Sequence, residues 1–244
     1  MSAKRIFATA KRVLQQLQHD RRTIGLILFV PSVLMIIMRY VFNDATATFS
    51  NLAPMILGIF PFTVMFLVTS VATLRERTAG TLERLMTLPI AKTDLLFGYA
   101  LAFAGLTILQ GAIASGVVMG LLGVSVTGGA GRLLIAATLA GLLGMSVGLF
   151  SSAFARSEFQ AVQFLPAFIL PQLLTCGLFV ARDKMAEPLQ WFSNVMPLTY
   201  IVDAMKQVTN QPGWGNDLVR DLAIISGYVV GALLLAAATL RRRV

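Results

Sequence analysis

The chain has 244 residues, of which 57% are hydrophobic and only 13% are charged. Soluble domains carry roughly 25% charged residues, so a chain of this length and composition must place most of its residues in a lipid bilayer. The formal net charge of +9 does not indicate nucleic-acid binding, because the basic residues lie at the edges of apolar segments. The single cysteine, Cys176, excludes an intramolecular disulfide and a multi-cysteine metal site.

Residues 3–19 are predicted to form a basic amphipathic helix. Its apolar side chains recur at helical spacing, at Ile6, Phe7, Ala10, Val13, Leu14 and Leu17. A basic amphipathic helix beside a membrane span usually lies in the interface between lipid and water. About twenty polar and basic residues precede the first apolar run and no small-residue cleavage site follows it, so we do not expect a cleavable signal peptide.

Six apolar segments follow that are long enough to cross a bilayer. We expect spans at residues 23–42, 52–74, 95–122, 133–155, 161–180 and 219–240. Asp20 is the expected N-cap of the first span. Residues 181–218 are too polar to cross, and are expected to stay at the membrane surface.

Six spans place both termini on the same side of the membrane, and the basic residues decide which side. Fourteen of the 20 basic residues fall on the side of the termini, whereas six fall on the other side, where six acids balance them. Because cytoplasmic loops carry the excess of Lys and Arg, we expect both termini in the cytoplasm of a bacterium, with the chain in its plasma (inner) membrane.

Glycines recur on the faces of several predicted spans and allow close helix packing there. Gly141, Gly144 and Gly148 share one face of the fourth span. Further small residues are spaced four apart at Gly111 and Ser115, Gly116 and Gly120, and Gly227 and Gly231. Since glycine is also frequent in membrane helices generally, we expect about half of these positions to have no packing role.

Residues 75–89 form a charged, helix-forming segment between two apolar runs. Thr81 can cap a short helix and Pro89 can end it. One face of that helix would be apolar, with Leu82, Leu85 and Met86. An apolar ridge with charged flanks is typical of a helix that docks into a partner's groove. A solvated loop that pairs Arg with Glu along the lipid surface fits the same residues equally well.

The chain contains no Gly-x-x-x-x-Gly-Lys-Ser/Thr phosphate loop, so we expect these residues to bind no ATP, cofactor or metal themselves. No carboxylate lies at mid-depth in a span, which disfavours a carrier coupled to protons or sodium. A membrane enzyme such as a lipid head-group transferase would need clustered acids, His or metal ligands. Outside segment 75–89, Asp94 and Glu158 lie near the cytoplasmic faces, and they lie singly.

The most polar side chains within the spans are candidates for lining a transport path. They are Gln110, Gln163, Gln172 and Thr175. Buried polar side chains in membrane helices more often hold helices together than bind a substrate.

The segment from Arg75 to Pro89, followed by Lys92 and a long apolar span, resembles the signature of type-2 ATP-binding-cassette (ABC) exporter permeases. The stretch 196–204, MPLTYIVDA, resembles the Pro-Leu-Thr-Tyr motif found late in that family. Here Met196 stands where an Asn commonly precedes the proline, which is expected to affect local helix capping. The six-span layout and the length match as well, so the resemblance covers essentially the whole chain.

The resemblance implies an all-α membrane protein with six transmembrane helices and no catalytic residues of its own. Residues 1–22 would form an interfacial helix and residues 23–244 the permease domain, with a cytoplasmic coupling helix at about 75–89 and short re-entrant outer helices at about 181–218. It also implies a dimer of permease subunits, paired with two nucleotide-binding ATPase subunits that hold ATP and magnesium. The carried-over ATPase contacts are Glu76, Arg77, Thr78, Gly80, Thr81, Leu82, Glu83 and Leu85.

The short outer loops are most similar to the multidrug and daunorubicin-resistance branch of the family. The expected cargo is therefore a hydrophobic or amphipathic drug, antibiotic or lipid-like molecule that leaves the cell. A polysaccharide or lipid-linked glycan is the alternative within the same family. Whether the second permease subunit is identical or merely similar is left open by the residues.

Overall fold

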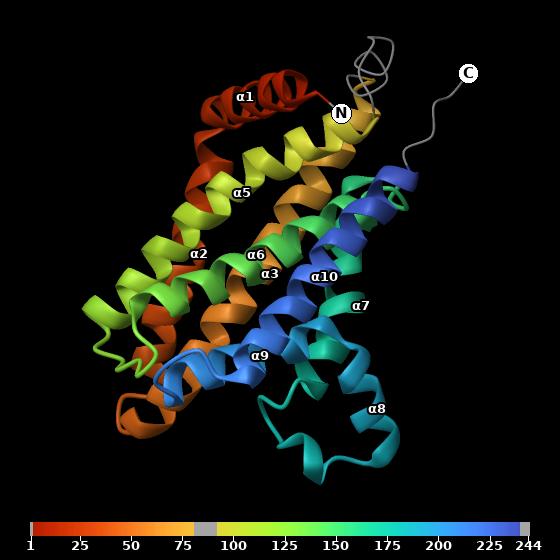
Figure 1. Cartoon of the computed structure of the whole chain (residues 1–244). Coiled ribbons are helices and arrows are strands. Elements are labelled where there is room, and N and C mark those ends of the chain that lie inside the picture. The colour runs from red at the N-terminus through yellow and green to blue at the C-terminus, as the bar shows by residue number, and fades with distance from the viewer. Residues whose placement is uncertain (1, 81–91, 240–244) are drawn as a thin grey trace.

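The computed structural model describes residues 2–80 and 92–239, and within these residues the chain is helical with no strand (Figure 1). The α-helices are α1 (Ala3–His19), α2 (Arg21–Val41), α3 (Thr46–Thr78), α5 (Lys92–Gly116), α6 (Ala130–Ser151), α7 (Glu158–Thr175), α8 (Glu187–Val195), α9 (Pro197–Asn210) and α10 (Asn216–Thr239). A π-helical turn, η1 (Val117–Leu121), continues α5, and a short 3-10 helix, η2 (Arg182–Lys184), precedes α8. The predicted all-α class is confirmed.

The long helices form a bundle with two distinct ends, which we call the α1 end and the α9 end. Helix α1 lies across one end, and the short helices α8 and α9 lie at the other (Figure 1). Successive long helices run in alternating directions between these ends. The end of α3 and the start of α5 therefore meet at the α1 end, on either side of residues 81–91.

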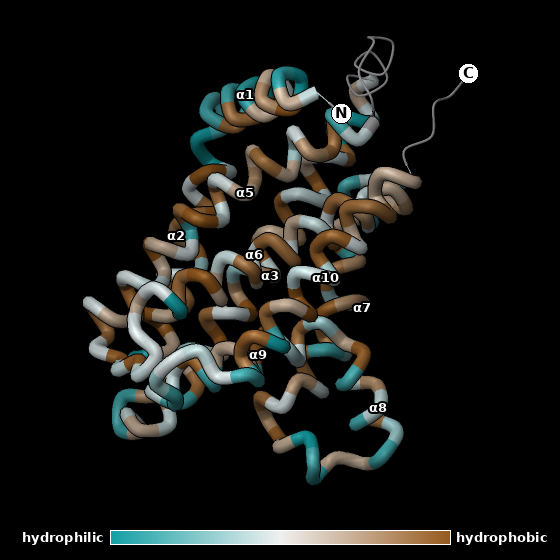
Figure 2. Tube along the Cα trace, in the orientation of Figure 1, coloured by the Kyte–Doolittle hydropathy of each residue, from teal (hydrophilic) through white to brown (hydrophobic). Residues whose placement is uncertain are grey.

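Within the described residues, five helices are long and apolar enough to cross a membrane, namely α2, α3, α5 with η1, α6 and α10. Figure 2 shows their mainly hydrophobic residues between the two more polar ends of the bundle. The remaining predicted span, 161–180, corresponds to α7, which has 18 residues and a less apolar composition because it carries Glu158 and three glutamines. It runs along α3 from the α1 end to the α9 end. Five spans are thus confirmed by length and composition, and the sixth stays a prediction.

The turn between α1 and α2 follows from one capping residue. Asp20 is the N-cap of α2, and its carboxylate accepts hydrogen bonds from the Thr23 backbone N–H at 3.1 Å and from the Thr23 hydroxyl at 2.6 Å. These bonds satisfy an N–H group that the first turn of a helix leaves free. The predicted cap is confirmed, and it lets α2 leave α1 at a sharp angle after a single residue.

The glycine face of α6 brings this helix against α3 and α5. A Cβ at Gly144 would overlap the Phe62 carbonyl, one at Gly148 would overlap Thr69, and one at Gly141 would overlap Thr107. The close packing predicted for these three glycines is confirmed. At Gly116, Gly120, Gly227 and Gly231, by contrast, an added Cβ would meet no atom within 4 Å.

The predicted start of the coupling helix, at about residue 75, differs from the structure. Residues 75–78 form the last turn of α3, so the coupling helix predicted from about residue 75 does not begin there. Ala79 follows as the C-cap, and Gly80 adopts φ of 69°, a left-handed conformation that ends many helices. The rest of the predicted coupling helix, residues 81–89, lies outside the described residues.

Residues 181–215 form the short elements η2, α8 and α9, and do not cross the bundle, as the sequence predicted for the segment 181–218. The motif Pro-Leu-Thr-Tyr explains their packing. Pro197 starts α9, the Thr199 hydroxyl donates to the Ser193 carbonyl at 2.8 Å, and the Tyr200 hydroxyl donates to the Asn194 carbonyl at 2.6 Å. Met196 is the N-cap and makes no side-chain capping bond, as expected for this departure from the family pattern.

Candidate functional site

Three helices are joined at a single arginine at the α1 end, and we call this cluster the three-helix junction (Arg12, Glu76 and Tyr99). Arg12 of α1 donates to the Glu76 carboxylate of α3 at 3.2 Å and to the Tyr99 hydroxyl of α5 at 2.7 Å. Its guanidinium also lies 5.7 Å from the centre of the Tyr99 ring, which adds a cation–π attraction. The junction thus fixes the end of α3 and the start of α5 relative to each other.

The junction is shielded from solvent. The Arg12 and Glu76 side chains are 28% and 16% exposed, and Tyr99 is buried. Removing one member of such a shielded pair leaves the other charge without compensation, which costs about 3–5 kcal/mol. A lysine at position 12 would keep the positive charge but would lose the flat guanidinium that lies against the Tyr99 ring.

A second contact holds the beginning of α1. Asp94 is 1% exposed, and its carboxylate accepts a hydrogen bond from the Ser2 backbone N–H at 3.1 Å. A negative charge at the start of a helix is favourable because the free N–H groups there are partly positive. This hydrogen bond connects the start of α5 to the start of α1.

Helix α1 buries its apolar face against protein. Ala10, Val13 and Leu17 pack with residues of α5 and α2, and Gly98 of α5 leaves room for Thr9 to approach closely. The prediction of an amphipathic helix at residues 3–19 is confirmed, and the buried part of its apolar face packs mainly on α5. A movement of α1 would therefore carry α5 with it.

Two further arginines tie the last turns of α3 to the start of α7 and the loop before it. Arg75 donates to both oxygens of the Glu158 carboxylate, at 2.8 and 2.9 Å. Arg77 donates to the Ser152 carbonyl at 2.7 Å. The hydrogen bonds from Arg75 lower the pKa of Glu158 below the ordinary value of a glutamic acid, so this carboxylate is charged at neutral pH.

The residues predicted to contact an ATPase differ in their surroundings in the structure. Glu76 and Arg77 bind other parts of the same chain, whereas Thr78 is exposed and Gly80 has open space around it. Thr81, Leu82, Glu83 and Leu85 lie outside the described residues. Arg12 and Tyr99 were missed because their partners are 64 and 87 residues away in the chain, and no local pattern in a sequence signals such pairs.

The residues predicted to line a path are not brought together. Gln110 is buried in α5 and donates to the Ile27 carbonyl of α2 at 2.7 Å. Gln172 donates to the Phe168 carbonyl at 2.8 Å and accepts from the Leu198 N–H at 3.3 Å, and the Thr175 hydroxyl donates to the Pro171 carbonyl. Gln163 lies on the exposed face of α7. Three of the four therefore make contacts within or between helices.

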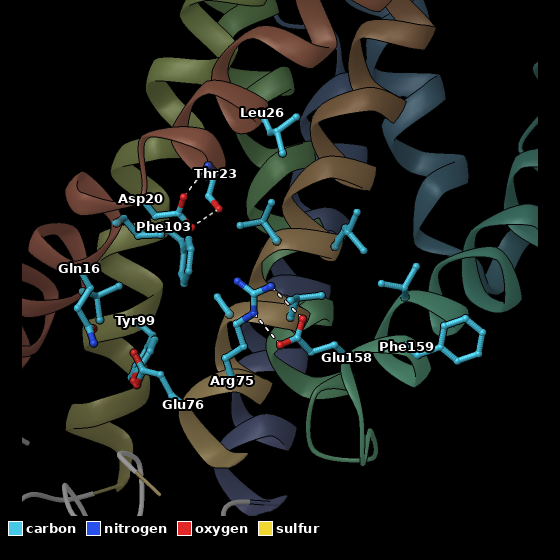
Figure 3. Close-up of a pocket in the computed structure, with 17 residues that line it drawn as sticks. Gln16, Asp20, Thr23, Leu26, Arg75, Glu76, Tyr99, Phe103, Glu158 and Phe159 are labelled. Carbon is cyan, nitrogen blue, oxygen red and sulfur yellow. Dashed lines mark hydrogen bonds and ion pairs between the residues drawn. The ribbon is translucent and has the colours of Figure 1, made fainter. Parts of the chain in front are cut away.

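A cavity of about 600 Å³ lies elsewhere, near the α1 end, where α1, α2, α3, α5 and α7 meet (Figure 3). Apolar and aromatic side chains from all five helices line most of it, and Asp20, Arg75, Glu76 and Glu158 provide the charged groups. None of the four predicted path residues lines it. We call it the α1-end cavity.

The arrangement is that of a multi-helix membrane protein in which Arg12 of α1 contacts both the end of α3 and the start of α5. Comparison with known families identifies the class. The profile of the ABC-2 type transporter family matches residues 4–209. The chain therefore belongs to the ABC-2 type transporter family, a family of membrane subunits of ABC transporters, and the predicted resemblance is confirmed.

Curated relatives show the same class. The chain is 27% identical over 171 residues to the probable multidrug ABC transporter permease YbhS of Escherichia coli, covering 70% of this chain and 45% of the relative. It is 28% identical over 177 residues to the inner membrane transport permease YhhJ of Escherichia coli, covering 72% and 46%. It is 26% identical over 157 residues to ABC transporter G family member 20 of Dictyostelium discoideum, covering 64% and 22%. The chain thus spans less than half the length of these relatives.

Proposed function

We propose that the chain is the permease subunit of an ATP-driven exporter that moves a hydrophobic or amphipathic molecule out of the cell. Family membership supports the transport role, and the name of the YbhS relative, a probable multidrug permease, supports a cargo of this class. The energy would come from an ATPase partner, which would bind ATP and magnesium. Two permease subunits and two ATPase subunits would form the working assembly.

The three-helix junction is the observation that carries this proposal. A permease that receives its energy from a separate subunit must convert a force on a surface segment into a movement of its membrane spans. Residues 81–91 connect α3 to α5, and Arg12 holds both of these helices to α1. A force applied by an ATPase at this segment would therefore move α1, α3 and α5 together.

The distribution of charge supports a cytoplasmic position for the α1 end. Nine basic residues of the described chain lie outside the apolar interior at this end, at Lys4, Arg5, Lys11, Arg12, Arg21, Arg22, Arg75, Arg77 and Arg156. Cytoplasmic surfaces of membrane proteins carry such an excess. In this orientation the ATPase would bind at the α1 end, and α8 and α9 would face the outside.

The test is to break the junction in the assembled transporter. The chain would be co-purified with its ATPase and placed in vesicles, and ATP-dependent accumulation of a hydrophobic fluorescent dye would be measured. We expect Arg12→Ala and Glu76→Gln each to lower accumulation about tenfold, a factor typical of a lost coupling between two sites. The variants should still insert into the membrane and bind the ATPase.

Lys184→Ala serves as the matched control, because Lys184 is an exposed cation at the α9 end. This variant should transport the dye at the level of the unmodified chain. Full transport by both junction variants would overturn the proposed route of coupling. Failure of any ATPase to co-purify with the chain would overturn the proposed function itself.

A further inference from the structure

We propose that the α1-end cavity is a binding site for a lipophilic organic cation. That this ligand is also the cargo rests on the proposed function. The binding itself does not, since it requires neither ATP nor a partner. The four path candidates chosen from the sequence do not line this cavity.

The size and the lining of the cavity suit a small amphipathic molecule. A volume of about 600 Å³ lies within the range of about 300–1,000 Å³ that is typical of small-molecule sites. Leu67 and Val71 of α3, Leu26 of α2 and Val162 of α7 supply apolar walls. Arg75 lies eight residues after Leu67, which corresponds to about 12 Å along the helix, so the walls extend well away from the charged groups.

Three of the four charged groups lie together in one part of the cavity. Figure 3 shows Arg75, Glu76 and Glu158 gathered at its lower side, while Leu26 lies at the upper side. Asp20 lies at the junction of α1 and α2, and its Thr23 hydrogen bonds lower its pKa, so it is an anion at neutral pH. An occupant would place its apolar part toward Leu26 and its charged group toward these residues.

The sign of the charge that fits follows from a local excess of carboxylates. The described chain has four acids at the α1 end, Asp20, Glu76, Asp94 and Glu158, and three of these line the cavity. Arg75 is the one basic residue among the described lining residues, and Glu158 holds it by two hydrogen bonds. Arg75 balances Glu158, and Arg12 balances Glu76, with which it pairs. Of the three carboxylates in the lining, one therefore has no basic partner among these residues.

Aromatic side chains in the wall favour the same class of ligand. Tyr99, Phe103 and Phe159 all line the cavity. The faces of aromatic rings attract organic cations, and the attraction is stronger at desolvated sites than at exposed ones. A zwitterionic phospholipid fits less well, because its phosphate would lie beside Asp20 and Glu158. We therefore assign the site to a free lipophilic monocation.

The test is a binding measurement with two probes of nearly equal shape and opposite charge. The purified chain in a neutral detergent would be dialysed against labelled tetraphenylphosphonium, and in a parallel experiment against tetraphenylborate. We expect saturable binding of the cation and only detergent background for the anion. Equal saturable binding of the two ions would overturn the proposal, and so would the absence of saturable cation binding to a folded chain.

Two variants of the ion pair make the test sharper because their expected effects have opposite signs. Glu158→Gln removes a carboxylate and releases Arg75, so cation binding should weaken about tenfold. Arg75→Gln removes the positive charge and releases Glu158, so cation binding should become severalfold tighter. If the pair only held α3 and α7 together, both variants would weaken binding, and that result would contradict the assignment.

Asp44→Asn is the matched control, since it makes the same change of charge at an exposed site at the α9 end. It should leave cation binding unchanged. Competition by phosphatidylethanolamine at stoichiometric amounts would identify an ammonium lipid as the occupant, and would overturn the assignment to a free cation. Cation binding without dye transport would retain the site while overturning the proposed function.

Discussion

At the scale of single residues, the packing of α6 depends on the absence of side chains. Gly144 and Gly148 place the α6 backbone against the Phe62 and Phe66 carbonyls of α3, with no space for a Cβ. Small residues at such positions let two membrane helices approach closely and gain van der Waals contact along their length. The same residue type has no such role at Gly227 of α10, where the surrounding space is open.

We therefore expect Gly144→Val to destabilise the chain by about 1–3 kcal/mol or more, because extra atoms in a well-packed contact force the backbones apart. The measurement is the melting temperature of the purified chain in detergent. It is taken from the loss of the monodisperse size-exclusion peak after heating. Gly227→Val makes the same substitution in open space and should melt close to the unmodified chain. Equal melting temperatures for both variants would contradict this account of α6.

At the scale of elements, α7 is attached to α3 by an ion pair that is half exposed. The Arg75 and Glu158 side chains are 58% and 51% exposed, so the pair contributes no more than about 1 kcal/mol to stability. Its role is mainly geometric, since it fixes where α7 starts beside the end of α3. The pKa of Glu158 is lowered by the Arg75 hydrogen bonds. The stabilising effect is therefore present above the ordinary carboxyl pKa and is lost as the pH falls through the lowered value.

The pH dependence of Glu158→Gln tests this contact. At pH 7 the variant should melt at a slightly lower temperature than the unmodified chain, because the charged pair is missing. As the pH is lowered below the ordinary glutamic acid pKa of 4.5, the difference should shrink toward zero, since Glu158 becomes protonated in the unmodified chain as well. A difference that grows on acidification would show that the sign of this assignment is wrong.

The elements also show how far the sequence could be interpreted. Helical periodicity and apolar runs located α1 and the long helices within a few residues, and the Asp20 cap was predictable from residue type and position. The end of α3 was misplaced because the charged residues 75–78 were assigned to a separate helix. The junction of Arg12, Glu76 and Tyr99 was not predictable, because it is formed by tertiary packing and leaves no periodic signal.

At the scale of the whole molecule, the α1 end and the α9 end of the bundle differ in charge as well as in structure. The α1 end carries an excess of basic residues, whereas the α9 end carries Arg39, Arg132, Arg182, Lys184, Lys206 and Arg220 together with six acids. Several of these charges at the α9 end are satisfied within the chain. Arg182 binds Asp203 at 2.6 Å, and the buried Asp221 accepts from Gln207 at 2.7 Å. The α9 end is thus nearly neutral and internally bonded, which suits short helices that do not cross the bundle.

This asymmetry predicts the orientation of the chain in the membrane. The single native cysteine, Cys176, is buried, so Cys176→Ala gives a background for labelling with a thiol reagent that does not cross membranes. We expect Glu187→Cys, at the α9 end, to be labelled in intact cells. Gln15→Cys, on the exposed side of α1, should be labelled only after the cells are permeabilised, because cytoplasmic surfaces carry the basic excess. If Gln15→Cys were labelled in intact cells while Glu187→Cys was protected, the orientation would be inverted, and the ATPase would have to bind at α8 and α9, far from the junction that holds α1, α3 and α5 together.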